Sequence, residues 1–190
     1  RRVLFRSETV VVQGAGTLGL YATAVAKDRG ASKVIVVDIV PQRLEMAKDF
    51  GADNVINASD LSDQELIEKV RDLTEGWGSD LVVEVAGTPK VVSAGLGMLR
   101  KGGRYAEIGN VFPGATFDVD ANDLITRWIT IKGIHNYDAL QLAEALSFVE
   151  RTRDIYPYKK LVTHKLSLND IEKGMKIMEE RKAIRVAICP

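Results

Sequence analysis

The sequence predicts an α/β protein whose core is a doubly wound, six-stranded parallel sheet. Two observations lead to this prediction. Short β-branched runs alternate with longer segments of helical periodicity, which is the pattern of repeated strand-helix-strand units. The runs are also apolar at nearly every residue, as expected of parallel strands that helices cover on both faces.

Six runs are expected to form the strands of this sheet, and the segments between the first five are expected to form its helices. Pro41 suits the first turn of the second helix, because the N–H that proline lacks has no helical partner there. The predicted strands are residues 9–13, 33–38, 54–57, 80–87, 103–109 and 129–134, and the predicted helices are residues 18–29, 41–50, 62–74 and 89–99.

The alternation loosens after residue 134. We expect a helix over residues 139–151, a short strand over 161–166, a helix over 168–180 and a last strand over 184–188. This tail is too short to enclose a large core alone, so we interpret it as an extension of the sheet domain. The predicted organisation is therefore a domain over residues 8–150 and a C-terminal extension over 151–190.

Composition and charge exclude several classes of function. Lys+Arg and Asp+Glu balance at 26 each, so nucleic acid is not an expected partner. No apolar run approaches the roughly 20 residues of a membrane span, so we expect a cytoplasmic protein with no membrane partner. The single cysteine, Cys189, and the two histidines, His135 and His164, are too few for a typical zinc site, so no metal is expected in this chain.

The turn Gly14-Ala15-Gly16-Thr17-Leu18-Gly19 follows the first predicted strand and opens the first predicted helix. Its first glycine permits a tight turn, its second lets the backbone approach a pyrophosphate, and its third lets the helix pack on the strand. The helix N-terminus supplies N–H groups and a favourable dipole for phosphate. A glycine turn alone is weak evidence, but this one has the strand and helix context that a dinucleotide site requires.

Asp38 closes the second predicted strand and supplies a second signal. A carboxylate at this position can accept both ribose hydroxyls of an adenosine and would repel a 2′-phosphate, which favours NAD over NADP as the cofactor. The alternative is that Asp38 only caps the helix that starts at Pro41. Arg43 lies within that helix and is interpreted either as a contact near the adenine or as a surface arginine.

With these residues, the chain resembles the medium-chain dehydrogenase/reductase superfamily, and within it the zinc-dependent alcohol, polyol and threonine dehydrogenase branch. The resemblance starts in "VVVQGAGTLGLYATAVAKDRGASKVIVVDIVPQRLEMAKDFGADNVIN" and continues through "GSDLVVEVAG", "LRKGGRYAEIG", "ITIKGIHNY" and "MEERKAIRVAI". It covers residues 8–190 and implies a Rossmann fold that binds NAD. The quinone-reductase branch resembles this sequence less well, because it often lacks the acidic residue after the second strand.

The resemblance also implies which residues meet the cofactor, and physical reasoning supports part of this set. Four of these residues fall at the carboxyl ends of predicted strands, where open α/β sheets bind ligands, although a glycine there is also common in plain turns. His135 is open to a role beside the nicotinamide or to a structural one. The implied residues are Gly14, Gly16, Thr17, Leu18 and Gly19 at the pyrophosphate, Asp38 and Arg43 at the adenosine ribose and adenine, Ala86 and Gly87 beside the adenosine, Ile108, Gly109, Gly133, Ile134 and His135 near the nicotinamide, and Arg185 at a phosphate.

In the family that this chain resembles, the catalytic zinc, its ligands and the proton relay belong to a domain that precedes the cofactor domain. There the zinc acts as a Lewis acid on the substrate oxygen while hydride passes to the nicotinamide. The resemblance therefore implies that this chain is the NAD-binding part of a homo-oligomeric enzyme acting on a small secondary alcohol or polyol. It also implies that the chain alone is inactive and that its C-terminal extension completes the missing domain.

Two alternatives stay open at this point. One is a zinc-free reductase of the same superfamily, and the other is a Rossmann domain that senses a nucleotide for a transporter or a transcription factor. Residues 1–7, "RRVLFRS", match codon by codon the end of a common short-read sequencing adapter, so we expect them to be an artefact of library DNA. Asp118, Asp120 and Asp123 are expected to cap a helix or stay solvated rather than to bind a metal.

Overall fold

The computed structural model describes residues 7–190, so the expected adapter-derived segment lies, apart from Ser7, outside the described residues. The chain divides into two compact units, one that ends at Asn136 and one that spans Tyr137–Pro190. The helix over residues 139–152 falls in the second unit, whereas the domain boundary expected from the sequence, after residue 150, stays a prediction. No helix in residues 7–190 is long and apolar enough to cross a membrane.

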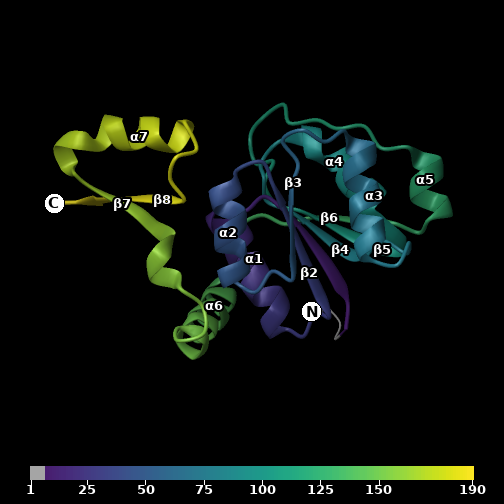
Figure 1. The fold of residues 1–190 in the computed structure, drawn as a ribbon, viewed down its shortest axis with the longest axis horizontal. Coiled ribbons are helices and arrows are strands. Elements are labelled where there is room, and N and C mark those ends of the chain that lie inside the picture. The colour runs from purple at the N-terminus through teal and green to yellow at the C-terminus, as the bar shows by residue number, and fades with distance from the viewer. Residues whose placement is uncertain (1–6) are drawn as a thin grey trace. The chain divides into compact units, whose positions relative to one another are not determined.

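The first unit contains the predicted six-stranded sheet, with the strands in the order β3-β2-β1-β4-β5-β6 and every neighbouring pair parallel (Figure 1). This order reverses direction at β1, so the carboxyl ends of β1 and β4 flank the point at which such sheets bind ligands. The strands are β1 (Thr9–Gln13), β2 (Lys33–Asp38), β3 (Asn54–Asn57), β4 (Ser79–Glu84), β5 (Leu99–Glu107) and β6 (Thr130–Gly133).

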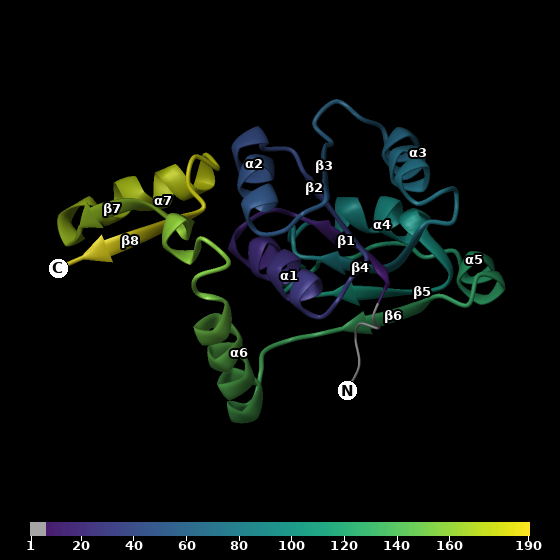
Figure 2. The ribbon, with the colours of Figure 1, turned by 60° about the horizontal axis from the view of Figure 1, so that its bottom comes forward.

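Helices cover both faces of this sheet, which confirms the doubly wound arrangement. Val11, Ile35 and Val82 pack in one core cluster with residues of α3 and α4, and the alternate residues Val10 and Val12 are equally buried on the opposite face. Figure 2 shows α1 and α2 together on one side of the strands and α3 and α4 on the other. These helices are α1 (Thr17–Asp28), α2 (Pro41–Asp49), α3 (Asp63–Leu73) and α4 (Val92–Met98).

Several elements differ from the sequence prediction, among them the strand expected over residues 103–109, which forms β5 over residues 99–107 and so starts at the last residue of the helix expected over 89–99. β4 ends at Glu84 rather than at residue 87, because the Glu84 carboxylate accepts the Gly87 N–H (2.7 Å) and the chain turns at that point. The helix expected over residues 89–99 starts as the 3₁₀ turn η1 (Pro89–Val91) before α4. No bounds were predicted for the helix next to the three aspartates, which is α5 (Ala121–Thr126); it is too short to show a helical period and is held at its start by Asp120.

The second unit is a small α/β structure. It contains α6 (Ala139–Thr152), the 3₁₀ turns η2 (Tyr158–Leu161) and η3 (Leu168–Asp170), α7 (Ile171–Glu179), and a two-stranded parallel sheet of β7 (Val162–Ser167) and β8 (Arg185–Cys189). α7 approaches both strands at Gly174, where a Cβ would lie 3.2 Å from a methyl of Val186 and 3.3 Å from one of Leu166. The helix expected over residues 168–180 is present, but its first turn is the 3₁₀ turn η3 and the α-helix ends at Glu179.

A capping box fixes the start of α3. The Ser62 hydroxyl accepts the Glu65 N–H (3.3 Å), and the Glu65 carboxylate accepts the Ser62 O–H (2.7 Å) and the Ser62 N–H (2.8 Å). The bond from the Ser62 hydroxyl, and after it the bond from the Ser62 N–H, lower the pKa of Glu65. We expect Ser62→Ala to reduce the free energy of unfolding by about 1 kcal/mol, because the N–H of Glu65 loses its partner. Urea unfolding followed by circular dichroism measures this, with Ser59→Ala, an exposed serine outside the helix, as the control. Equal stabilities of the two variants would show that the box contributes nothing.

Candidate dinucleotide-binding site

The glycine turn after β1 is closed by direct contacts between backbone atoms. Gly14 has a φ of +104°, and a Cβ there would lie 2.8 Å from the N of Ala86. Its own N–H donates to the carbonyl of Val37 (2.8 Å), which ties the turn to β2. At Gly19 a Cβ would lie 1.8 Å from the carbonyl oxygen of Gly14, so α1 can start beneath the turn only if this residue is glycine. Gly14 and Gly19 thus have the packing roles predicted for them.

Gly16 differs from these two glycines because no neighbouring atom lies within 4 Å of where its Cβ would be. Gly16 is the N-cap of α1, has an extended backbone, and offers no side chain to the N–H groups of the first turn. That turn holds no acidic residue, and Leu18 within it is 60 % exposed. The start of α1 therefore has no side-chain cap from Gly16, and its positive dipole end lies beside open space, which fits a pyrophosphate.

The Asp38 carboxylate links the glycine turn to the loop after β2. One oxygen accepts the N–H of Ala15 (2.6 Å), and the other accepts the N–H groups of Ile39 (2.7 Å) and Val40 (2.9 Å). Val40, not Asp38, is the N-cap of α2, and α2 has no side-chain cap. The oxygen bound to Ala15 keeps a second lone pair, which can accept a ribose hydroxyl. Asp38 thus holds the glycine turn against the loop after β2, and its carboxylate also fits the predicted contact with a ribose hydroxyl.

The loops after β4 and β5 meet the glycine turn at the same edge of the sheet. A Cβ on Gly109 would lie 2.6 Å from the N of Gly87, and one on Gly87, whose φ is +71°, would lie 3.2 Å from the carbonyl oxygen of Gly109. The backbone of Ala86 touches Gly14, as described above. Three loops distant in the sequence therefore come into contact through small residues, and four of the residues predicted from the sequence lie together there.

Two carboxyl groups that the sequence analysis did not single out lie directly behind these loops. Glu84 and Glu107 are register partners at the carboxyl ends of β4 and β5, and Glu84 is fully buried. Glu84 accepts the N–H groups of Gly87 (2.7 Å) and Gly109 (2.9 Å), one with each oxygen. Burial raises the pKa of Glu84, the Gly87 N–H opposes this, and the Glu107 side chain raises it further by hydrogen bonding and charge. The sequence contained one signal that could have pointed to these two glutamates: each lies near the end of a predicted strand, and the two strands follow each other along the chain.

A buried network of hydrogen bonds joins β1, β5 and η1 next to the two glutamates. The Tyr105 hydroxyl donates to Oε1 of Gln13 (2.9 Å), and Nε2 of Gln13 donates to the carbonyl of Val91 (2.8 Å). Burial, together with the negative charges of Glu107 and Glu84, raises the pKa of Tyr105, so its phenol is neutral. Gly95 leaves room for the network, since a Cβ there would lie 2.4 Å from Oε1 of Gln13.

The other residues predicted for the site lie on several elements. Arg43 is half-buried in the first turn of α2, and Ile108 donates its N–H to the carbonyl of Glu84 (3.2 Å). At the end of β6 the Ile134 N–H donates to the carbonyl of Glu107 (2.9 Å), and a Cβ on Gly133 would meet open space. His135 is exposed after β6, and Arg185 is exposed on β8 in the second unit.

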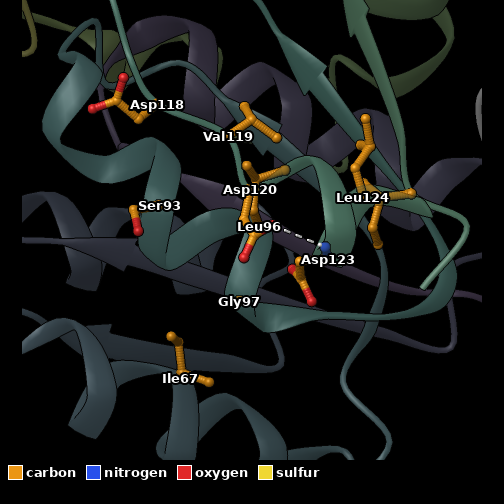
Figure 3. A pocket seen from close by; sticks show the side chains of 10 residues that line it. Ile67, Ser93, Leu96, Gly97, Asp118, Val119, Asp120, Asp123 and Leu124 are labelled. Carbon is orange, nitrogen blue, oxygen red and sulfur yellow. Dashed lines mark hydrogen bonds between the residues drawn. The ribbon is translucent and has the colours of Figure 1, made fainter. Parts of the chain in front are cut away.

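A pocket of about 260 Å³ in the first unit has a different chemistry (Figure 3). Apolar side chains of α3 and α4 form one part of its lining, and three aspartates lie around α5. Asp120 caps α5 through the N–H groups of Asn122 (2.8 Å) and Asp123 (3.3 Å), as predicted for a carboxylate before a helix, and Asp123 pairs with Arg127 (2.7 Å). The lining residues are Ile67, Ser93, Leu96, Gly97, Asp118, Val119, Asp120, Asp123, Leu124 and Ile129.

The six parallel strands in this order, with a glycine turn between β1 and an uncapped helix, define a Rossmann-type α/β domain. Comparison with known proteins then gives the family. The family described as "Zinc-binding dehydrogenase" matches residues 17–151. This chain belongs to that family, which confirms the resemblance to zinc-type medium-chain dehydrogenases seen in the sequence.

Individual relatives agree with this assignment. L-threonine 3-dehydrogenase of Symbiobacterium thermophilum is 31% identical over 185 residues, which are 97% of this chain and 51% of the relative. 5-exo-hydroxycamphor dehydrogenase of Pseudomonas putida is 33% identical over 187 residues, or 95% of this chain and 50% of the relative. The structure of an alcohol dehydrogenase from Thermotoga maritima matches with a TM-score of 0.90 and 34% identity, over 98% of this chain and 51% of that one. The chain therefore spans about half the length of the relatives it matches.

Proposed function

We propose that this chain is the NAD-binding half of a zinc-type dehydrogenase that oxidises a small alcohol or polyol. One observation above all supports the proposal: the loops after β1, β4 and β5 meet through glycines beside the uncapped start of α1 and beside Asp38. The names of the relatives, which include threonine and hydroxycamphor dehydrogenases, support a small hydroxyl-bearing substrate. They also favour a dehydrogenase over a nucleotide-sensing domain. We further propose a homo-oligomeric whole protein in the cytoplasm.

In this proposal, bound NAD supplies the acceptor for a hydride from the alcohol carbon, and the residues of this chain hold the dinucleotide. The N–H groups of Thr17 and Leu18 bind the pyrophosphate at the start of α1, and the absent side chain of Gly16 lets it approach. Asp38 accepts a ribose hydroxyl, with Arg43 near the adenine. Ala86 and Gly87 border the adenosine.

Further residues are proposed to place the nicotinamide and a phosphate. Ile108, Gly109, Gly133, Ile134 and, as the weaker candidate, His135 would flank the nicotinamide at the ends of β5 and β6, and Arg185 would reach a phosphate. Within residues 7–190, no group of three or more His, Cys, Asp or Glu side chains could hold a metal ion. These residues therefore do not supply a ligand set for the zinc of the proposed whole enzyme, and we propose that its ligands lie outside this chain.

The preference for NAD tests the role of Asp38. We expect the chain to bind NAD at least about tenfold more tightly than NADP, because the carboxylate repels a 2′-phosphate at close range. Asp38→Asn removes that charge, and we expect it to narrow the ratio of the two dissociation constants, measured by calorimetry. Asp60→Asn, which removes an exposed charge from a loop, should leave the ratio unchanged. NADP binding as tight as NAD binding in the unmodified chain would contradict the proposed role.

A further inference from the structure

We propose that Glu84 and Glu107 hold one proton between them, and that this protonated pair is a positioning device that keeps the loops after β4 and β5 in the arrangement that binds NAD. The proposal rests on the proposed function for its effect on NAD, but the shared proton stands on the geometry of the two strands. Neither carboxyl group is expected to touch the cofactor.

The strand register brings the two carboxyl groups together. Glu84 and Glu107 lie directly opposite each other on parallel strands, and their side chains lie on the same face of the sheet as Val82 and Tyr105. Neighbouring strands are about 4.8 Å apart, so two ionised carboxylates at this pair would repel each other strongly. Glu84 is fully buried and Glu107 is half-buried, and carboxyl groups this close in such a setting keep one proton, which then bridges them.

Among the four carboxyl oxygens of the pair, the hydrogen bonds leave one, Oε2 of Glu107, without a donor; Oδ1 of the neighbouring Asn110 also lacks one but carries no charge. Oε1 of Glu107 accepts from Nδ2 of Asn110 (2.9 Å) and from its N–H (3.3 Å). Oε2 of Glu107 is buried and receives no donor from any residue that the structure describes. Both oxygens of Glu84 are already acceptors, Oε1 for the N–H of Gly87 and Oε2 for the N–H of Gly109 and, more weakly, for Nδ2 of Asn110 (3.5 Å). A proton between Oε2 of Glu107 and Glu84 therefore completes the bonding of both groups.

Within residues 7–190, no cationic side chain contributes to the shifted pKa of Glu84. Burial, the N–H groups of Gly87 and Gly109, and Glu107 account for the shifted pKa of Glu84. Around this end of the strands, β1 contributes the neutral Gln13 and β5 the neutral Tyr105. The lysines Lys90 on η1 and Lys132 on β6, and His135 after β6, are exposed to solvent. Among the described residues, therefore, no cation balances the charge of the pair, and we infer that a proton does.

The pair controls the loops because Glu84 bridges them. One of its oxygens holds the loop after β4 at Gly87, and the other holds the loop after β5 at Gly109. When the proton leaves to solvent, two like charges face each other behind these loops, and their repulsion separates the ends of β4 and β5. NAD affinity should then fall, with a limiting slope of about tenfold per pH unit for the loss of one proton.

Infrared spectroscopy of the 190-residue chain tests the proton directly. We expect the carbonyl stretch of a protonated carboxyl at neutral pH, and we expect it to disappear as the pH rises. Glu107→Gln keeps the shape of the side chain and gives Glu84 an amide donor, so this variant should lack the band at neutral pH. Glu68→Gln, an exposed position on α3, should keep it. A wild-type chain without the band, or a Glu107→Gln chain that retains it, would overturn the shared proton.

Calorimetry then tests the effect on the site. Wild type and Glu68→Gln should bind NAD more weakly as the pair loses its proton, whereas Glu107→Gln should bind with nearly constant affinity over the same range. A Glu107→Gln profile that parallels that of the wild type would overturn the positioning role. If the wild type binds no NAD at any pH, the proposed function fails, and the infrared result still decides the shared proton.

Stability gives a readout that needs no cofactor. The folded chain keeps the proton of Glu84 above the pH at which the unfolded chain releases it, so the folded state binds more protons there and its stability falls as the pH rises. We expect Glu107→Gln to have a higher unfolding midpoint than wild type at alkaline pH, with the difference shrinking toward the ordinary pKa of glutamate. Midpoints that differ by the same amount at every pH would contradict the pair.

Discussion

Gly19→Ala is expected to lower the free energy of unfolding by about 3 kcal/mol or more. The Cβ of the new alanine would lie 1.8 Å from the carbonyl oxygen of Gly14, and that oxygen belongs to backbone that cannot rotate away. Gly14 is itself held by the carbonyl of Val37 on one side and by the backbone of Ala86 on the other. Relief therefore requires α1 to shift away from β1, which opens buried core at Leu20 and Ala24.

Urea unfolding followed by circular dichroism measures this loss, and Gly16→Ala is the matched control. It adds the same methyl group to the same turn, at a position where no atom lies within 4 Å and φ is −70°. The control is expected to lose no more than about 1 kcal/mol, because Gly16 is a half-buried N-cap at which alanine is a poorer residue than glycine but meets no clash. Equal losses at the two positions would show that close packing of the turn is not what requires glycine.

Gly16→Ala is also expected to weaken NAD binding by about tenfold or more, even though the fold is kept. The open space above Gly16 is where the proposed pyrophosphate approaches the start of α1, and a methyl group there would hold it away from the N–H groups. The two variants therefore distinguish Gly16, which is proposed to make room for the ligand, from Gly14 and Gly19, which are required for the packing of the turn.

Calorimetry with NAD measures this effect, and Gly133→Ala is a useful comparison. Gly133 also has open space at its Cβ, but it lies at the end of β6, where the proposed contact is with the nicotinamide end. We expect the smaller loss of affinity at Gly133, because fewer hydrogen bonds depend on that approach. Wild-type affinity in Gly16→Ala would refute the pyrophosphate position.

Most of the fold could be predicted because its signals are local. The strands over residues 9–13, 33–38 and 54–57 have the predicted bounds, since each is an apolar run that ends at a polar or turn-forming residue. Right-handed crossovers between parallel strands decide which face of the sheet each helix covers, but the order of the six strands was not predicted. The bounds of α5 could not be predicted, because a six-residue helix whose main signal is the cap at Asp120 shows no period.

The site could be predicted only where a motif has a fixed spacing along the chain. The glycine turn is of this kind, and the structure brings it together with Ala86, Gly87 and Gly109. Glu84 and Glu107 are different, because their partnership depends on the register of β4 against β5. That register includes an irregularity between Ser79 and Leu81, and nothing in the two segments alone specifies it.

Asp38 shows a further limit of sequence reasoning. The sequence indicates a carboxylate at the end of β2 and hence a ribose contact, but not that the same carboxylate accepts three backbone N–H groups. The residue therefore carries a structural role that a ligand-based interpretation overlooks. For this reason Asp38→Asn, which keeps one acceptor oxygen, is a better test of specificity than Asp38→Ala.

The central claim is that this chain binds NAD at the loops after β1, β2, β4 and β5, and NMR titration of the ¹⁵N-labelled chain tests it most directly. With NAD added, the amide signals of Gly16, Thr17, Leu18, Ile39, Gly87 and Gly109 should shift together and saturate with a single dissociation constant. Signals around the pocket beside α5, such as those of Ser93 and Leu124, should stay in place. No shifts at saturating NAD, or shifts confined to that pocket, would contradict the account.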